Sequence, residues 1–109
     1  MSYNIVYTNE FEKEIKKLSS KYPSLRSDFR KFIVVISENP VAGAPLGNHC
    51  YKVRLAIKSK GQGKSGGARV ITCVRIEMNT VILVSIYDKS EKETISDKEI
   101  KERLKKYLG

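Results

Sequence analysis

Residues 51–58, YKVRLAIK, alternate apolar side chains with basic or small ones in strict order. Successive side chains of a β-strand point to opposite faces of the sheet, so this period of two predicts a strand with one buried face. Val53 and Leu55 then face the core, and Lys52 and Arg54 project together from the opposite face. This strand decides how the neighbouring segments are assigned, because they are best explained as its partners in a sheet.

Two further strands are predicted at residues 68–77 and 81–87, with a tight turn between them. Three strands in close succession predict an antiparallel meander. The third strand is apolar almost throughout, which is typical of a strand that is central or covered on both faces. The loop at residues 59–67 is rich in glycine and lysine, and residues 41–50 are expected to be irregular.

Helical patterns flank this meander on both sides. Residues 3–7 predict a short strand, residues 9–22 and 25–38 two amphipathic helices that form a hairpin, and Ser96 caps a short last helix. The order predicts a single α+β domain over residues 1–109. In this domain an N-terminal strand and helical hairpin pack on an antiparallel β-meander, and a short C-terminal helix follows.

The size and composition of the chain limit what it can be. It has 109 residues, enough for one modest core. No apolar run approaches the roughly 20 residues of a membrane helix, and the N-terminus lacks the features of a signal peptide. The two cysteines, Cys50 and Cys73, are too few for a disulfide framework. We therefore expect a soluble, cytoplasmic protein with no membrane partner.

The charge of the chain is concentrated in one segment. There are 21 Lys and Arg residues against 12 Asp and Glu residues, a net charge of +9. No acidic residue lies between Glu38 and Glu77. The basic residues of that window are Lys52, Arg54, Lys58, Lys60, Lys64, Arg69 and Arg75. An uncompensated excess of this kind favours a polyanionic partner such as nucleic acid. Parity along the strands places Lys52, Arg54, Arg69 and Arg75 on the polar side of two adjacent strands.

Several nucleotide, metal and nucleophile motifs are excluded by their context. Residues 61–66, GQGKSG, match a dinucleotide fingerprint, but a strand follows them, so no helix N-terminus is available for the pyrophosphate. A Walker A loop would need glycine where Lys58 stands. His49, the only histidine, is best explained as a structural or surface residue, and the adjacent Cys50 would point the opposite way. One histidine and two cysteines are too few for a zinc site, so no metal or cofactor is expected.

A rigid basic face can in principle cleave RNA without a metal. Arginines hold a phosphate bidentately and stabilise its developing negative charge. A lysine crowded by like charges becomes a stronger candidate for a general base near neutral pH. Lysine, arginine and tyrosine side chains are therefore chemically sufficient for attack of a 2′-hydroxyl on the adjacent phosphate.

Four segments resemble the RelE/ParE superfamily of bacterial toxins, and its HigB- and RelE-like branch most of all. They are residues 51–55 (YKVRL), 61–67 (GQGKSGG), 68–71 (ARVI) and 84–89 (VSIYDK). The resemblance implies a metal-independent endoribonuclease, an mRNA interferase, that cleaves mRNA in the A site of the 70S ribosome. The products would be a 2′,3′-cyclic phosphate and a 5′-hydroxyl. It also implies a cognate antitoxin, often one with a helix-turn-helix DNA-binding domain.

Carried over by position, the resemblance implies a catalytic set of Lys52, Arg54, Arg69, Tyr87 and Lys89. Lys52 and Arg54 match the basic pair of the family, Arg69 its phosphate-binding arginine, and Lys89 a basic residue after the last strand. Some RelE members have a catalytic tyrosine further on, but residues 93–96 contain none. Tyr87 is considered as its substitute, either donating a proton or stacking on a base, and Lys52 or Lys89 as the general base or acid. Contacts with RNA are expected from Lys58, Lys60, Lys64, Arg75 and Lys92.

Two other functions remain open at this point. A ParE-like toxin would have nearly the same fold and inhibit DNA gyrase by binding, without cleaving RNA. A non-catalytic RNA- or ribosome-binding domain would show salt-sensitive affinity for RNA and no cleavage product. The basic residues at positions 52, 54 and 69 favour RNA cleavage over inhibition of gyrase.

Overall fold

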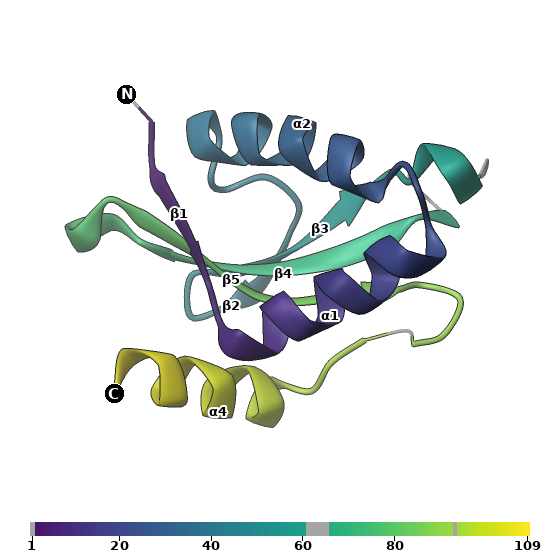
Figure 1. Cartoon of the computed structure of the whole chain (residues 1–109). Helices are drawn as coiled ribbons and strands as arrows, with labels where there is room; N and C mark the ends of the chain where they lie inside the picture. The colour runs from purple at the N-terminus through teal and green to yellow at the C-terminus, as the bar shows by residue number, and fades with distance from the viewer. Residues whose placement is uncertain (1, 61–65, 93) are drawn as a thin grey trace.

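The computed structural model of the chain describes residues 2–60, 66–92 and 94–109. At its centre lies a five-stranded sheet with the strand order β1-β5-β4-β3-β2 (Figure 1). The strands are β1 (Asn4–Tyr7), β2 (Ala44–Gly47), β3 (Cys50–Leu55), β4 (Ala68–Arg75) and β5 (Thr80–Asp88). The helices are α1 (Asn9–Lys21), α2 (Leu25–Glu38) and α4 (Asp97–Leu108), with 3-10 turns η1 (Lys58–Lys60) and η2 (Ile76–Met78). This is the α+β architecture that the sequence predicts.

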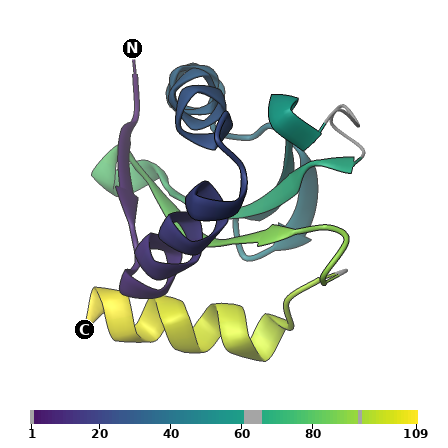
Figure 2. The same ribbon diagram turned by 45° about the vertical axis from the view of Figure 1, so that its right-hand side comes forward.

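Helices cover both faces of the sheet, with α4 on the side opposite α2 (Figures 1 and 2). The core under α1 and α2 includes Phe11, Leu25, Ile36, Val70 and Leu83. The core under α4 includes Ile71, Ile82, Val84, Ile100 and Leu104. Strand β5 is buried along its whole length, as its apolar sequence predicts. None of the described helices is long and apolar enough to cross a membrane.

The meander is confirmed, because β3 pairs antiparallel with β4 and β4 antiparallel with β5. Both β3 and β4 end earlier than expected, since η1 follows β3 and η2 follows β4. The sheet as a whole is mixed, because β1 pairs parallel with β5. The alternation of side chains identifies a strand but not its partner or direction.

The expectation of an irregular segment at residues 41–50 is wrong for Ala44–Gly47. This segment is the edge strand β2, which pairs antiparallel with β3. The hairpin turn consists of Asn48 and His49, with φ angles of 53° and 62°. Two central residues with positive φ define the turn type that joins tightly paired strands. Gly43 precedes β2 at a φ of 92°, where a Cβ atom would collide with the carbonyl oxygen of Lys52.

The helix termini and the position of α4 are fixed by specific hydrogen bonds. Thr8 and Ser96 cap α1 and α4, each accepting a backbone N–H of the first turn at 3.1 Å. Arg103 of α4 donates to both carboxylate oxygens of Glu14, at 3.0 and 3.1 Å, and to the carbonyl of Val84 at 3.0 Å. Bidentate pairs of this kind constrain orientation as well as distance. They fix α4, and with it the segment that leads into α4, against α1 and β5.

Candidate functional site

Three of the predicted catalytic residues form a row across the sheet. Arg54 of β3 lies opposite Arg69 of β4, and Arg69 lies opposite Tyr87 of β5. We call Arg54, Arg69 and Tyr87 the cross-strand row. Residues opposite one another across a sheet share a face. Cys50 and Cys73, four pairs further along the ladder and on the same face, belong to the core under α4, so this row lies on the α4 side. The parity expected from the sequence is therefore confirmed for Arg54 and Arg69.

Arg69 is the buried centre of this row, with only 5% of its surface exposed. Its guanidinium donates to the carbonyl of Ala68 at 3.2 Å. Burial is the main cause that lowers the pKa of Arg69, and the nearby charge of Arg54 lowers it further. Like charges directly opposite each other on neighbouring strands destabilise a sheet. An anion bound between the two guanidinium groups would offset this repulsion, so the pair is suited to bind one.

Tyr87 closes the row on β5 and is 5% exposed. Burial raises the pKa of the Tyr87 hydroxyl, while a hydrogen bond with Thr94 and the charge of Arg69 oppose the increase. The ammonium of Lys92 lies 5.8 Å from the centroid of the Tyr87 ring. The ring is therefore buried, with Lys92 beside it.

Lys52 lies beside the row, two residues before Arg54 on the same face of β3. Its ammonium donates to the hydroxyl of Thr94 at 3.1 Å. Lys52 lies opposite Ile71 of β4, and Ile71 lies opposite Ser85 of β5. The structure therefore brings together Lys52, the cross-strand row and Thr94. Thr94 is absent from the sequence prediction, because an isolated threonine before a helix carries no signal of its own.

Lys89 follows the row in the turn after β5, where its side chain is exposed. Its backbone N–H donates to the carbonyl of Gly67 at 3.3 Å. Gly67 is required there, because a Cβ atom at this position would collide with the carbonyl oxygen of Leu55. The end of β5, the start of β4 and the end of β3 therefore meet closely beside the cross-strand row.

This junction is held by the buried carboxylate of Asp88. It accepts hydrogen bonds from the Lys60 ammonium at 2.7 Å, from the Tyr22 hydroxyl at 2.5 Å, and from the backbone and hydroxyl of Ser90. We call Asp88, Lys60, Tyr22 and Ser90 the Asp88 anchor. Burial would raise the pKa of Asp88, but the bonds from Lys60, Tyr22 and Ser90 together hold it far below its usual range. The anchor joins α1, η1 and the turn that carries Lys89.

Lys60 is expected from the sequence to contact RNA, but in the structure its side chain is buried. Its side chain is only 8% exposed and its ammonium is paired with Asp88, so little of it is left to contact RNA. Lys64, which the sequence also assigns to RNA contacts, lies outside the described residues. The backbone of Lys58 donates to the buried Asp28 at 3.0 Å, and its exposed side chain lies close enough to Lys31 to lower the pKa of Lys31.

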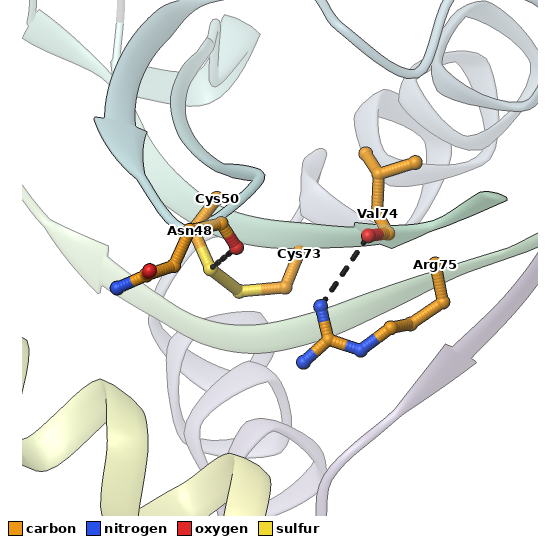
Figure 3. Close-up of a disulfide and its surroundings, with 5 residues drawn as sticks. All are labelled: Asn48, Cys50, Cys73, Val74 and Arg75. Atoms are coloured by element: carbon orange, nitrogen blue, oxygen red, sulfur yellow. Dashed lines mark hydrogen bonds between the residues drawn. A yellow bond between two sulfur atoms is a disulfide. The ribbon is translucent and has the colours of Figure 1, made fainter.

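Arg75 lies apart from the other site residues. Figure 3 shows its side chain on the same side of β4 as Cys73, while Val74 points the other way, as parity predicts. Six residues separate Arg75 from Arg69, a distance of about 20 Å along a strand. Its guanidinium donates to the carbonyl of Val74 at 3.4 Å. Arg75 therefore belongs to the same face of the sheet but not to the same site.

Cys50 and Cys73 form a disulfide between β3 and β4 (Figure 3). Their spacing of 23 residues does not predict this pairing, which depends on the register of the two strands. A nucleophilic role for Cys50 beside His49 is therefore excluded in this state, because neither cysteine is a free thiol. His49 is exposed and serves in the β2–β3 turn, in line with a structural or surface residue.

A groove of about 850 Å³ adjoins the site between α2 and the strands β2 and β3. Apolar side chains line its floor, among them Phe32, Ile36, Val53 and Leu55. Its basic lining residues are Lys31, Lys52, Arg54, Lys58 and Arg69. Three of these residues, Lys52, Arg54 and Arg69, also belong to the site, and we call the basic residues that line the groove and the site the basic surface.

The chain is similar to known toxins in both sequence and fold. The family model of the RelE toxin of the RelE/RelB toxin–antitoxin system matches residues 4–107. No curated protein sequence matches the chain significantly.

Solved structures show the same fold. The free E. coli RelE toxin with two arginine-to-alanine substitutions is 23% identical, with a TM-score of 0.64 over 97% of this chain and 98% of that chain. A chain of the intact E. coli RelBE toxin–antitoxin complex is 26% identical, with a TM-score of 0.61 over 80% and 96%. The RelBE2 toxin–antitoxin complex of Mycobacterium tuberculosis matches at 18% identity and a TM-score of 0.62 over 81% and 92%.

The family match spans nearly the whole chain and includes every element of the sheet. It confirms the resemblance that the four sequence segments indicate, and the shared fold agrees with it. This chain therefore belongs to the RelE toxin family of toxin–antitoxin systems.

Proposed function

We propose that this toxin is a metal-independent endoribonuclease that cleaves mRNA in the A site of the ribosome. The observation that supports this proposal is the cross-strand row with Lys52 beside it. It combines two arginines for a phosphate, a tyrosine hydroxyl and a lysine within one small area of a rigid sheet. Phosphoryl transfer to a 2′-hydroxyl requires these functions and no others.

The proposed reaction assigns one role to each side chain. The 2′-oxygen attacks the adjacent phosphorus, the bond to the 5′-oxygen breaks, and a 2′,3′-cyclic phosphate and a 5′-hydroxyl remain. Arg54 and Arg69 stabilise the negative charge of the pentavalent phosphate. Lys52 or Lys89, as the neutral amine, accepts the proton of the 2′-hydroxyl, and a separate acid protonates the departing 5′-oxygen. Tyr87 is better suited to donate this proton than to stack on a base, because its ring is buried and covered by Lys92.

Lys89, Lys92 and Lys58 are proposed to contact RNA around this centre. All three side chains are exposed on or beside the basic surface, unlike that of Lys60. Arg75 is proposed as a more distant contact on the same face. Charge–charge attraction to phosphates would make this binding sensitive to salt.

A cognate antitoxin is the proposed regulatory partner. The E. coli and Mycobacterium tuberculosis structures that share this fold include toxin–antitoxin complexes. A net charge of +9 predicts that the antitoxin covers the basic surface with carboxylates. We further propose that it carries a helix-turn-helix DNA-binding domain and that the toxin acts in the cytoplasm, where ribosomes translate mRNA.

Primer extension on mRNA translated in vitro tests the proposed activity. The wild-type toxin should produce ribosome-dependent cuts, and Arg69→Ala and Lys52→Ala should each reduce cleavage at least about a hundredfold. Arg30→Ala is the matched control, because Arg30 is an exposed arginine of α2 outside the site. Unchanged cleavage in both site variants would refute the assignment.

The same preparation separates the alternative functions. Inhibition of gyrase supercoiling without any mRNA cleavage would identify a ParE-like toxin. Ribosome binding without cleavage, with only mild effects of Arg→Lys changes, would identify a non-catalytic binding domain.

A further inference from the structure

Thr94 occupies a distinctive place between two candidate catalytic groups. Its hydroxyl accepts a hydrogen bond from the Lys52 ammonium at 3.1 Å, over a sequence separation of 42 residues. It also forms a hydrogen bond with the Tyr87 hydroxyl. Lys52 and Tyr87 come from β3 and β5, the outer strands of the meander, and Thr94 joins them from the segment before α4.

The chemistry of the ammonium fixes the direction of the bond between Lys52 and Thr94. An ammonium can only donate, so the Thr94 oxygen accepts from Lys52. The single hydrogen of the Thr94 hydroxyl is directed toward the carbonyl oxygen of Ile95 at 3.4 Å, and the Tyr87 hydroxyl is its other neighbour. Thr94 therefore lies between Lys52 and Tyr87 and interacts with both through one hydroxyl group.

A hydroxyl group is well suited to hold a lysine that must act on RNA. A carboxylate at this position would neutralise the ammonium and repel the phosphate. A hydroxyl restricts the rotation of the long side chain and leaves its charge uncompensated. The ion pairs within the described ranges do not include Lys52, so Thr94 supplies its polar contact among these residues without adding a negative charge.

The backbone around Thr94 is fixed by its neighbours. The next residue, Ile95, is 6% exposed and belongs to the core under α4. Ser96 then caps α4, and Arg103 ties α4 to Glu14 and Val84. The position of the Thr94 hydroxyl is therefore set by the docking of α4, although the residue itself is exposed.

We propose that Thr94 is a positioning residue of the cleavage site, whose hydroxyl holds the Lys52 ammonium beside the Tyr87 hydroxyl. This inference rests on the proposed function of the same site. Thr94 does not touch the reacting atoms; it acts by holding the Lys52 ammonium in place. A misplacement of Lys52 by about 1 Å would be expected to slow cleavage by one to two orders of magnitude.

Steady-state cleavage of mRNA on programmed ribosomes tests the inference with two matched variants. Thr94→Val keeps the shape of the side chain and removes its hydroxyl, and Thr94→Ser keeps the hydroxyl. We expect Thr94→Val to lower kcat about tenfold or more with KM within about twofold of wild type, and Thr94→Ser to retain at least about a third of wild-type kcat. Thr80→Val is the control, since its hydroxyl bonds Met78 at the distant η2 turn.

Two further measurements exclude a merely structural effect. In a Lys52→Met background, Thr94→Val should cause no additional loss, because the residue acts through Lys52. NMR relaxation of the Lys52 side chain in the free toxin should show greater mobility in Thr94→Val and wild-type mobility in Thr94→Ser.

The outcomes separate this inference from the proposed function. A wild-type toxin that cleaves no mRNA would refute the proposed function whatever Thr94 does. If the wild type cleaves and Thr94→Val cleaves equally well, or if Thr94→Ser is as impaired as Thr94→Val, the positioning role is refuted. Additive effects of Thr94→Val and Lys52→Met would refute it as well.

Discussion

The ammonium of Lys60 lies 2.7 Å from Oδ1 of Asp88, and the two side chains are 8% and 0% exposed. This buried ion pair joins η1, at the end of β3, to the end of β5, 28 residues further along the chain. Tyr87 directly precedes Asp88, and Lys89 directly follows it. The Asp88 anchor therefore determines how the exposed Lys89 is presented beside the cross-strand row.

Replacement of Asp88 by asparagine should strongly destabilise the protein. The change leaves the buried ammonium of Lys60 without a counter-charge, while the shape of the residue is kept. Breaking a buried pair by removing one partner costs about 3–5 kcal/mol, so we expect a loss of this size in the free energy of unfolding in urea. The double variant Asp88→Asn/Lys60→Met should regain part of it, since no unpaired charge remains. A single variant within about 1 kcal/mol of wild type would contradict this role of the pair.

Acid should unfold the protein partly through the same carboxylate. The pKa of Asp88 is lower in the folded protein than in the unfolded chain, so its ionised form stabilises the fold. That contribution is complete above the unfolded value of about 3.9 and is lost as the pH falls toward the folded value. Below about pH 4 the free energy of unfolding should fall more steeply with decreasing pH for wild type than for Asp88→Asn. Parallel pH profiles of urea unfolding would show that Asp88 is not the group responsible.

Much of the sheet follows from local patterns, and the rest depends on pairing. The alternation around Lys52 and the apolar strand β5 predict the meander, because side-chain period is a local property. Strand β2 lies among glycines and a proline that signal a loop, and only its partner β3 makes it a strand. The parallel position of β1 likewise depends on β5 rather than on its own sequence.

In the candidate site, too, some residues can be placed from local sequence patterns and others depend on long-range contacts. Parity along β3 and β4 is sufficient to place Lys52, Arg54 and Arg69 on one face of the sheet. The same segment predicts that Lys60 contacts RNA, but its ammonium is buried in an ion pair with Asp88, 28 residues further along the chain. Thr94 enters the site only because α4 docks under the sheet. Composition and periodicity carry no information on such long-range contacts.

The repulsion between Arg54 and Arg69 should lower the stability of the fold, and the same pair should bind an anion. They lie directly opposite each other on β3 and β4. Removing one charge relieves a repulsion of about 0.2–1 kcal/mol, so Arg54→Gln should unfold at slightly higher urea concentration than wild type while cleaving less mRNA. Inorganic phosphate at constant ionic strength should stabilise wild type more than Arg54→Gln, because a ligand stabilises only the state that binds it. Arg30→Gln is the control, and an equal response of Arg54→Gln and wild type to phosphate would contradict an anion site at this pair.

Reduction of the Cys50–Cys73 disulfide should weaken the fold without abolishing cleavage. The bond closes a loop with a sequence separation of 23, which corresponds to about 3 kcal/mol of chain entropy in the unfolded state. A thiol reductant should therefore lower the free energy of unfolding by about this amount in wild type and leave Cys50→Ser/Cys73→Ser unaffected.

Cleavage should persist under the same reducing conditions, because the β3–β4 and β4–β5 ladders hold the cross-strand row independently of the sulfur bridge. This result is also required if the toxin acts in the cytoplasm, where thiols are kept reduced. Parallel urea titrations and primer-extension assays with and without reductant measure both effects. A reduced toxin that stays folded but no longer cleaves mRNA would show instead that the disulfide, two residues from Lys52, is needed to hold Lys52 in place.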